Sequence, residues 1–199
     1  MKNDVDLVRR KTVSGVLAAA ISLTGGWGSA AQTPGADHDG RIYPPRPVPD
    51  IPVRCADGGS TTLGALLQAK ATALHLFFAQ CTTTCPIMGA VFERVQKLLS
   101  DSAVRSVQLL SLSIDPEADT PESLRKWLEQ FHAREGWVAA VPRTKDVAAI
   151  RTFFGDGGRE VGNHITQVQI IDRNGALIWR TFDLPSANSI AAILRKMEA

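Results

Sequence analysis

The 199-residue sequence predicts an α/β fold, in which helices flank a central mixed sheet and a small hairpin precedes it. Three observations support this prediction. Ala73 to Phe78 is a continuous apolar run, which is typical of a strand covered on both faces. From Pro86 to Leu99, Ile87, Val91, Val95 and Leu98 fall on one face at three- and four-residue spacing, which indicates a helix. Strand and helix patterns continue to alternate toward the C-terminus, as a layered domain requires.

The elements can be assigned in order. Asp57-Gly58-Gly59 is a hairpin signal between two short β-prone runs. Thr120 is a suitable N-cap, and Pro121 is tolerated at the first helical position. Asp172 to Gly175 joins two later strands. The expected strands are Ile51–Cys55, Ser60–Thr62, Ala73–Phe78, Val107–Ile114, Ile165–Ile171 and Ala176–Phe182. The expected helices are Leu63–Gln68, Pro86–Leu99, Thr120–Phe131, Thr144–Phe154 and Ser186–Met197. This order indicates a thioredoxin-like sheet with helices on both faces.

The N-terminal segment differs in composition from the rest. Residues 1–31 combine a basic start, Arg9 to Lys11, with the apolar run Val13 to Leu23 and small residues after it, which is the pattern of a signal peptide. An uncleaved N-terminal anchor in the membrane is the alternative. Residues 32–50 are rich in Pro, Gly and Asp and predict a flexible tether. We therefore expect an exported protein whose thioredoxin-like domain spans residues 51–199.

The overall charge excludes one class of function. A net charge of +2 and 44% hydrophobic residues describe an ordinary globular protein. No clustered Lys/Arg face of the kind that nucleic-acid binders use is evident, so we expect no nucleic-acid partner. The length suits one domain with its own core rather than two.

Two cysteines lie in the loop between the apolar strand and the helix that follows it. Cys81 and Cys85 precede Pro86, near a helix start where backbone amides and the macrodipole favour a thiolate. Residues four apart at a helix start lie about 5–6 Å apart, so the sulfurs can form a disulfide or share one soft metal ion. A structural disulfide is the usual role in an exported protein, but so short a loop gains little stability from it and suits reversible chemistry. We predict a redox-active or metal-binding pair.

Three segments together resemble the Sco/SenC family. They are Phe77 to Pro86, which contains C-x-x-x-C-P, Ser113 to Pro121, which contains D-P-x-x-D-T, and Asn163-His164 ahead of a predicted strand. The resemblance covers about Val48 to the C-terminus. It implies a thioredoxin-fold copper protein of the bacterial periplasm or mitochondrial intermembrane space, associated with assembly of the copper A centre of cytochrome c oxidase.

The resemblance also implies a ligand set. In the family, the two motif cysteines and the distal histidine bind Cu(I) or Cu(II), and the matching positions here are Cys81, Cys85 and His164. Two thiolates suit Cu(I), whereas an imidazole helps to accommodate Cu(II). Without the resemblance, His164 would be interpreted as an ordinary solvated or core histidine. Asn163 departs from the family, in which an Asp commonly precedes this histidine, and that change alters the field near the site.

Two roles for such a site stay open. One is a metallochaperone that delivers copper to an oxidase subunit or another copper enzyme, which is the role we prefer. The other is a thiol:disulfide oxidoreductase that reduces a partner's cysteines with Cys81 and Cys85. A peroxidase on the same fold would need an activated cysteine beside Thr82 to Thr84. We expect a periplasmic monomer, either free or tethered to the inner membrane through its N-terminus.

The other histidines and the third cysteine are expected to have no part in the site. His75 lies within a buried strand, His132 ends a helix, and His38 lies in the tether. Cys55 leaves an odd number of cysteines and is expected to be a buried thiol, with an intermolecular or redox role as the alternative.

Two carboxylates and two tryptophans complete the candidates. Asp119 is expected to be structural, at the turn before a capped helix, and Asp115 to lie near the ligands as a supporting group. Trp127 and Trp137 are expected to be core or surface aromatics rather than a recognition surface.

Overall fold

The computed structural model describes residues 40–100 and 106–197. The strands are β1 (Gly40–Pro47), β2 (Pro52–Cys55), β3 (Ser60–Thr62), β4 (Ala71–Phe77), β5 (Val107–Ser113), β6 (Trp137–Pro142), β7 (Val168–Ile171) and β8 (Ala176–Arg180). The helices are α1 (Leu63–Leu67), α2 (Thr84–Ser100), α3 (Pro121–Gln130), α4 (Thr144–Phe154), α5 (Ala187–Lys196) and the 3₁₀ helix η1 (Val161–Asn163). Within these described ranges, no helix is both long and apolar enough to cross a membrane.

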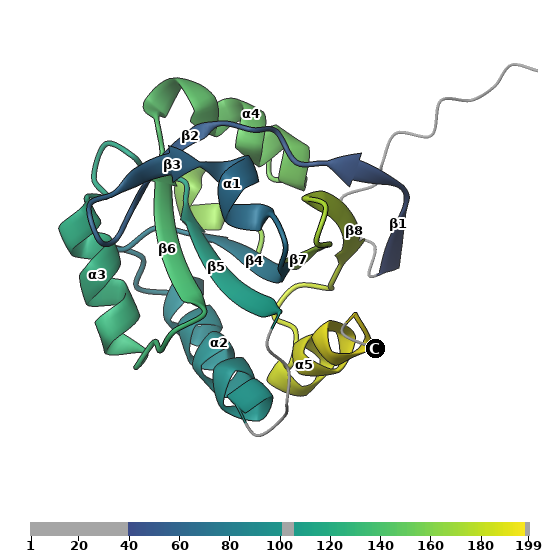
Figure 1. Ribbon diagram of the computed structural model, residues 1–199. Coiled ribbons are helices and arrows are strands. Elements are labelled where there is room, and N and C mark those ends of the chain that lie inside the picture. Colours follow the sequence, from purple (N-terminus) through teal and green to yellow (C-terminus); the bar gives the residue numbers. More distant parts are fainter. Residues whose placement is uncertain (1–39, 101–105, 198–199) are drawn as a thin grey trace, which may run out of the picture. The chain divides into compact units, whose positions relative to one another are not determined.

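The strands form one eight-stranded mixed sheet in the order β1-β8-β7-β4-β5-β6-β2-β3 (Figure 1). β4, β5 and β6 run parallel to one another, and the remaining neighbours are antiparallel. Helices α2, α3 and α5 cover one face, and α1 and α4 cover the other. The thioredoxin-like α/β fold predicted from the sequence is therefore confirmed.

Strand β4 shows why its sequence is mostly apolar, with Thr72 and His75 as its buried polar residues. All of its residues are buried, and they alternate between two hydrophobic clusters. Ala73 and Phe77 pack toward α2, α3 and α5, whereas Leu74 and Leu76 pack toward α1 and α4. A strand covered on both faces cannot alternate apolar with polar residues. β4 therefore carries the loop that follows it on a rigid central support.

The strands differ from the expected ones in three places. Residues 40–47, expected to belong to a tether, form β1, which pairs with β8; edge pairing of this kind leaves no apolar periodicity in the sequence. Strand β6 was not predicted, because its run Trp-Val-Ala-Ala-Val-Pro carries a weak β signal. The strand expected from Ile165 begins at Val168, because Asp156 and Asp183 accept the backbone N–H groups of Ile165 and Thr166.

The buried face of α2 also differs from the expected one. The sequence predicted a face that includes Ile87 and Val91, yet the residues turned into the core include Met88 and Phe92. Val91 lies on the flank toward α5, and Ile87 is exposed. The 17-residue helix carries two apolar stripes, and periodicity alone does not say which one faces the sheet.

Candidate metal centre

The two cysteines lie where β4 ends and α2 begins. After Phe77 the chain turns, and the N–H of Cys81 donates to the carbonyl oxygen of Phe78 at 3.1 Å. Helix α2 starts at Thr84, so Cys85 lies in its first turn, and the Cys85 backbone N–H donates to Cys81 Sγ at 3.4 Å. First-turn amides have no partner within the helix. The helix start thus directs a free N–H donor at the first sulfur.

This geometry makes the two thiols unequal. Burial disfavours the Cys81 thiolate, but hydrogen bonds from the Cys85 thiol, the backbone amides of Thr83 and Cys85 and the Thr83 hydroxyl lower the pKa of Cys81 from 9.0 to about 7. Burial raises the pKa of Cys85, and its hydrogen bond with Cys81, the Cys81 charge and Asp119 raise it further. Cys81 is therefore the thiolate near neutral pH, and Cys85 is the proton donor beside it.

His164, which follows η1, places its imidazole beside the Cys85 sulfur. Its Nε2 lies 3.2 Å from Cys85 Sγ, and its Nδ1 lies 2.7 Å from the carbonyl oxygen of Ile165. A carbonyl oxygen only accepts hydrogen bonds, so Nδ1 carries the proton and Nε2 presents its lone pair to the cysteines. Burial lowers the pKa of His164, which keeps the imidazole neutral and able to act as a ligand.

The three side chains converge. The sulfurs of Cys81 and Cys85 and a ring nitrogen of His164 all lie within 4.8 Å of one another, and each residue is buried. Cys81 is 7% exposed and His164 is 6% exposed, whereas Cys85 is 1% exposed. No disulfide links the cysteines in this structure. The site thus brings together the three residues that the sequence proposed as ligands, with Cys81 and His164 toward the surface.

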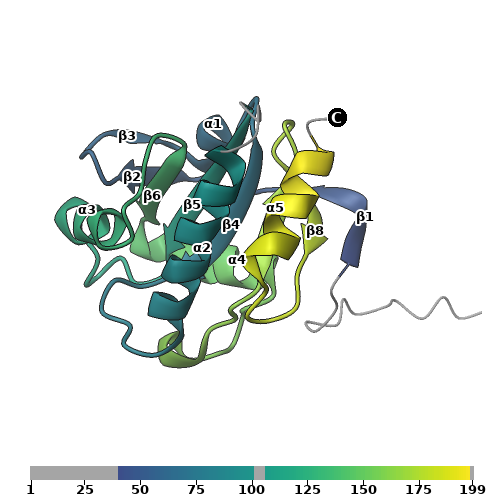
Figure 2. The same ribbon diagram turned by 90° about the horizontal axis from the view of Figure 1, so that it is seen from below.

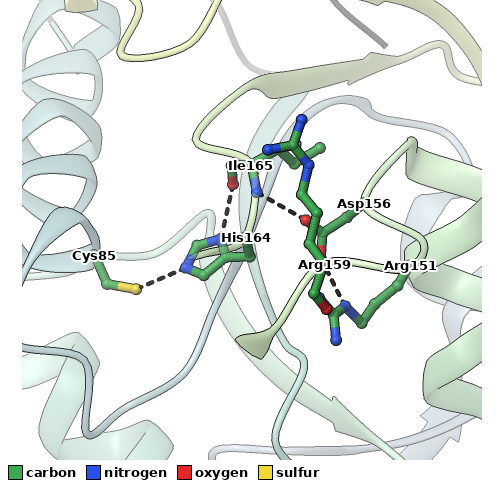
Figure 3. A network of polar contacts seen from close by, with 6 residues as sticks. All are labelled: Cys85, Arg151, Asp156, Arg159, His164 and Ile165. Atoms are coloured by element: carbon green, nitrogen blue, oxygen red, sulfur yellow. Dashed lines mark hydrogen bonds and ion pairs between the residues drawn. The ribbon is translucent and has the colours of Figure 1, made fainter. Parts of the chain in front are cut away.

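An ion pair that the sequence did not suggest holds the histidine segment (Figure 3). Asp156 Oδ1 accepts the backbone N–H of Ile165 at 2.8 Å, and its Oδ2 accepts from Arg151 Nε at 2.6 Å. Arg151 also donates through Nη2 to the carbonyl oxygen of Arg159. The Asp156 side chain is fully buried, and that of Arg151 is 12% exposed. Asp156 and Arg151 thus fix the backbone beside His164, although no motif marks them.

A second buried carboxylate holds the cysteine segment. Asp119 accepts the N–H of Ala79 with both oxygens, at 3.1 and 3.2 Å, and the hydroxyl of Ser113 at 2.6 Å. Burial raises the pKa of Asp119, although the hydrogen bonds from Ser113 and Ala79 act against that rise. Asp115 contributes through its backbone, which donates to Ser113 Oγ and accepts from the Asp119 N–H. Asp119 is thus the carboxylate that supports the cysteine loop, through Ala79, which precedes Cys81 by two residues, whereas Asp115 contributes through its backbone.

His75 is a core residue, as expected. The indole N–H groups of Trp127 and Trp137 donate to Ser111 Oγ at 3.3 and 3.0 Å, so the Ser111 hydroxyl donates to His75 Nε2 at 2.8 Å. Burial, assisted by the charge of His164, lowers the pKa of His75 to about 3. Both tryptophans are buried, which confirms their interpretation as core aromatics.

The remaining candidates lie apart from the site or outside the described residues. Cys55 is half-buried on β2 and packs with the cluster under α1 and α4, and it does not join the ligand group. The His132 side chain is exposed, and its Nδ1 lies 3.3 Å from Glu93 Oε1. His38 falls outside the described residues.

Fold and site together define a class: a thioredoxin-like protein with two thiols and one imidazole gathered beyond the C-terminal end of the central strand β4. The SCO1/SenC family model matches residues 56–198. The chain belongs to the SCO1/SenC family.

Individual relatives agree with this assignment. The chain is 32% identical over 75 residues to a SCO1 protein homolog of Bacillus subtilis (strain 168), a match that spans 38% of each protein. It is 23% identical over 137 residues to a SCO2-like protein of Rickettsia typhi, which covers 65% of this chain and 67% of the relative. The chain thus spans well under two thirds of the Bacillus subtilis relative.

Solved structures share the fold. A SCO1/SenC family lipoprotein from Bacillus anthracis superposes with a TM-score of 0.67 at 22% identity, over 79% of this chain and 99% of that one. Arabidopsis thaliana ScoI, solved with copper bound, superposes with a TM-score of 0.64 at 14% identity, over 75% of this chain and 97% of that one. BsSco, described as a member of the Sco family of cytochrome c oxidase assembly proteins, superposes with a TM-score of 0.65 at 18% identity, over 80% of this chain and 99% of that one.

Proposed function

We propose that this protein binds copper through Cys81, Cys85 and His164 and delivers it to the copper A centre of cytochrome c oxidase, or to another copper enzyme. The observation that carries the proposal is the convergence of the three donor atoms within 4.8 Å. Copper in the structure of Arabidopsis ScoI and the family's link to oxidase assembly support it.

The donor set fits copper in both oxidation states. Two soft sulfurs suit Cu(I), and the unprotonated Nε2 of His164 adds the nitrogen that Cu(II) favours. Because the pKa of Cys81 is already lowered to about 7, the ion displaces few protons when it binds there. Three protein ligands also leave a coordination position for a donor from the receiving protein, which transfer requires.

A second candidate, thiol:disulfide exchange, is favoured by the unequal thiols. The Cys81 thiolate would attack a partner's disulfide and release one partner thiolate, which leaves a mixed disulfide. Because the Cys81 charge helps to raise the pKa of Cys85, that pKa falls once Cys81 is bonded, and the Cys85 thiolate can then attack Cys81. The products are a Cys81–Cys85 disulfide and a partner reduced by two electrons.

The proposal includes an export route. The basic and apolar pattern of residues 1–31 supports either a cleaved signal peptide or an N-terminal anchor, and residues 32–39 would join it to the domain, whose first strand is β1. The description of the Bacillus anthracis relative as a lipoprotein is consistent with an exported protein. We place the protein in the periplasm as a monomer.

One paired titration separates the two roles. Cu(I) and Cu(II) are titrated into the reduced parent and into His164→Ala, and reduction of a disulfide-containing copper A domain is followed under the same conditions. A metallochaperone binds one copper per chain tightly and reduces the domain slowly, and His164→Ala weakens Cu(II) binding far more than thiol exchange. If His164→Ala bound Cu(II) as tightly as the parent, the proposed site would be wrong.

A further inference from the structure

Large apolar side chains are exposed on segments that are linked, in sequence or by hydrogen bonds, to those that carry the proposed copper ligands. Among the described residues, the exposed large hydrophobics are Tyr43, Ile87, Phe182 and Leu184. Ile87 follows Cys85 by two residues in the first turn of α2 and is 51% exposed. Phe182 and Leu184, 61% and 51% exposed, lie in the loop between β8 and α5. We call Ile87, Phe182 and Leu184 the apolar rim.

The loop that carries two rim residues is bonded to the histidine segment. Asp183, which separates Phe182 from Leu184, accepts the backbone N–H of Thr166 at 2.8 Å and the Thr166 hydroxyl at 2.9 Å. The Leu184 N–H donates in turn to Thr166 Oγ1 at 3.1 Å. Thr166 lies two residues after His164, so these bonds connect the two rim residues to the ligand by a short, ordered path.

Leu184 is exposed at a conformational cost. Its φ is 49°, in the left-handed region that glycine and asparagine adopt more readily than leucine. Backbone strain of this kind persists where the surrounding structure enforces it, and it concentrates at binding sites. The Leu184 backbone is held by its hydrogen bond to Thr166, but side-chain burial does not explain a leucine at this position, because the residue is 51% exposed.

The other side of the rim is a shallow groove between α2 and α5, which lie side by side (Figure 2). It is lined by Pro86, Ile87, Ala90, Val91, Arg94 and Ala187. Arg94 is the only charged residue in this lining. The groove therefore offers an apolar floor with one cation at its edge, which complements an apolar surface that carries a carboxylate.

We propose that the apolar rim and this groove form the docking surface for the copper-receiving protein. Its occupant is a protein whose own metal ligands lie within an apolar surface with an acidic residue placed opposite Arg94. This inference rests on the proposed function, because a recessed metal ion can pass only to a donor that comes into contact with the site. Cys81 and His164 are 7% and 6% exposed, so the partner must seat on the surface that surrounds them.

The test measures copper transfer and binding to one probe, the apo form of a soluble copper A domain from a bacterial cytochrome c oxidase. Ile87→Ser and Phe182→Ser are each expected to lower the second-order transfer rate constant about tenfold, because each removes an anchor of large apolar area. Their Cu(I) affinities stay within about twofold of the parent's, since neither residue binds the ion. Tyr43→Ser is the matched control, because Tyr43 is exposed beside the opposite end of α5.

Two further variants separate docking from folding. Leu184→Asn relieves the backbone strain, so its thermal midpoint rises by about 2 °C while transfer slows. Arg94→Glu slows transfer most at low salt, and the difference from the parent narrows as salt is added.

Each outcome has a distinct meaning. If the parent transfers copper and the rim variants match it, or if Tyr43→Ser slows transfer as much as they do, the docking surface is wrong and the proposed function stands. If the parent binds the domain through the rim without transferring copper, the docking surface stands and the delivery role is wrong. If the parent neither binds the domain nor transfers copper, both are wrong.

Discussion

The cysteine segment and the histidine segment meet at one site but are built in different ways. Cys81 and Cys85 are placed mainly by the end of β4, a turn and the first turn of α2, and Asp119 holds the turn through Ala79. His164 follows η1 and is placed by tertiary bonds from Asp156, which is itself bonded to Arg151 on α4. The thiols therefore depend on a helix start, and the imidazole depends on a buried ion pair.

Because of this difference, changes in the two segments should affect the binding of Cu(I) and of Cu(II) differently. Both states use the cysteines, whereas the nitrogen of His164 matters most for Cu(II). Damage to the histidine segment is therefore expected to act selectively on Cu(II), and damage to the cysteine segment to act on both states. The next predictions test this contrast, beginning with the largest effect.

Asp156→Asn is expected to weaken Cu(II) binding roughly 10- to 100-fold, the range for groups that orient a ligand, and to leave Cu(I) binding nearly unchanged. The amide can still accept from Ile165, but Arg151 loses its charged partner, so unfolding should require about 3 kcal/mol less. Competitive copper titrations and chemical denaturation measure both effects. Asp146→Asn, which breaks the more exposed pair with Arg143, should cost at most about 1 kcal/mol. Equal losses of Cu(I) and Cu(II) in Asp156→Asn would contradict the selective role of this segment.

Asp119→Asn is expected to weaken Cu(I) and Cu(II) binding together, by roughly tenfold or less. The amide NH2 that replaces one carboxylate oxygen cannot accept a hydrogen bond, and the remaining oxygen carries no charge, so unfolding should require about 1–3 kcal/mol less. Competitive copper titrations and chemical denaturation measure these two effects as well. Asp115→Asn is the control, because the bonds described for Asp115 run through its backbone. A loss confined to Cu(II) would show that Asp119 does not act through the cysteine loop.

The smallest effect concerns the pH at which Cys81 reacts. The thiolate is the reactive form, and a pKa lowered to about 7 moves its half-maximal alkylation down from pH 9, whereas the raised pKa of Cys85 keeps that thiol unreactive to higher pH. Mass spectrometry of iodoacetamide-labelled peptides from the copper-free protein gives both profiles. Thr83→Ala should move the Cys81 midpoint upward by less than about one pH unit, because the hydroxyl is a minor contributor. Preferential labelling of Cys85 near pH 7 would reverse the assignment.

The sequence could predict what local patterns determine. Spacing and a helix start indicated the thiol pair, and Thr120 and Ser186 cap their helices as N-cap side chains should. His164 entered only through a family resemblance, because 79 residues separate it from Cys85. Asp156 and Arg151 could not be found, since nothing in the sequence shows that the acid after α4 is buried and accepts the N–H of Ile165. Burial against a neighbouring element also decided which stripe of α2 faces the core.

The most direct test of the account is X-ray absorption spectroscopy on the copper-loaded protein and on His164→Ala. For the Cu(II) form of the parent, we expect two sulfur ligands and one imidazole nitrogen, from the residues whose donor atoms converge within 4.8 Å. For His164→Ala we expect that the imidazole signal disappears while both sulfurs remain. A variant spectrum that keeps the imidazole, or a parent spectrum without two sulfurs, would contradict the proposed site.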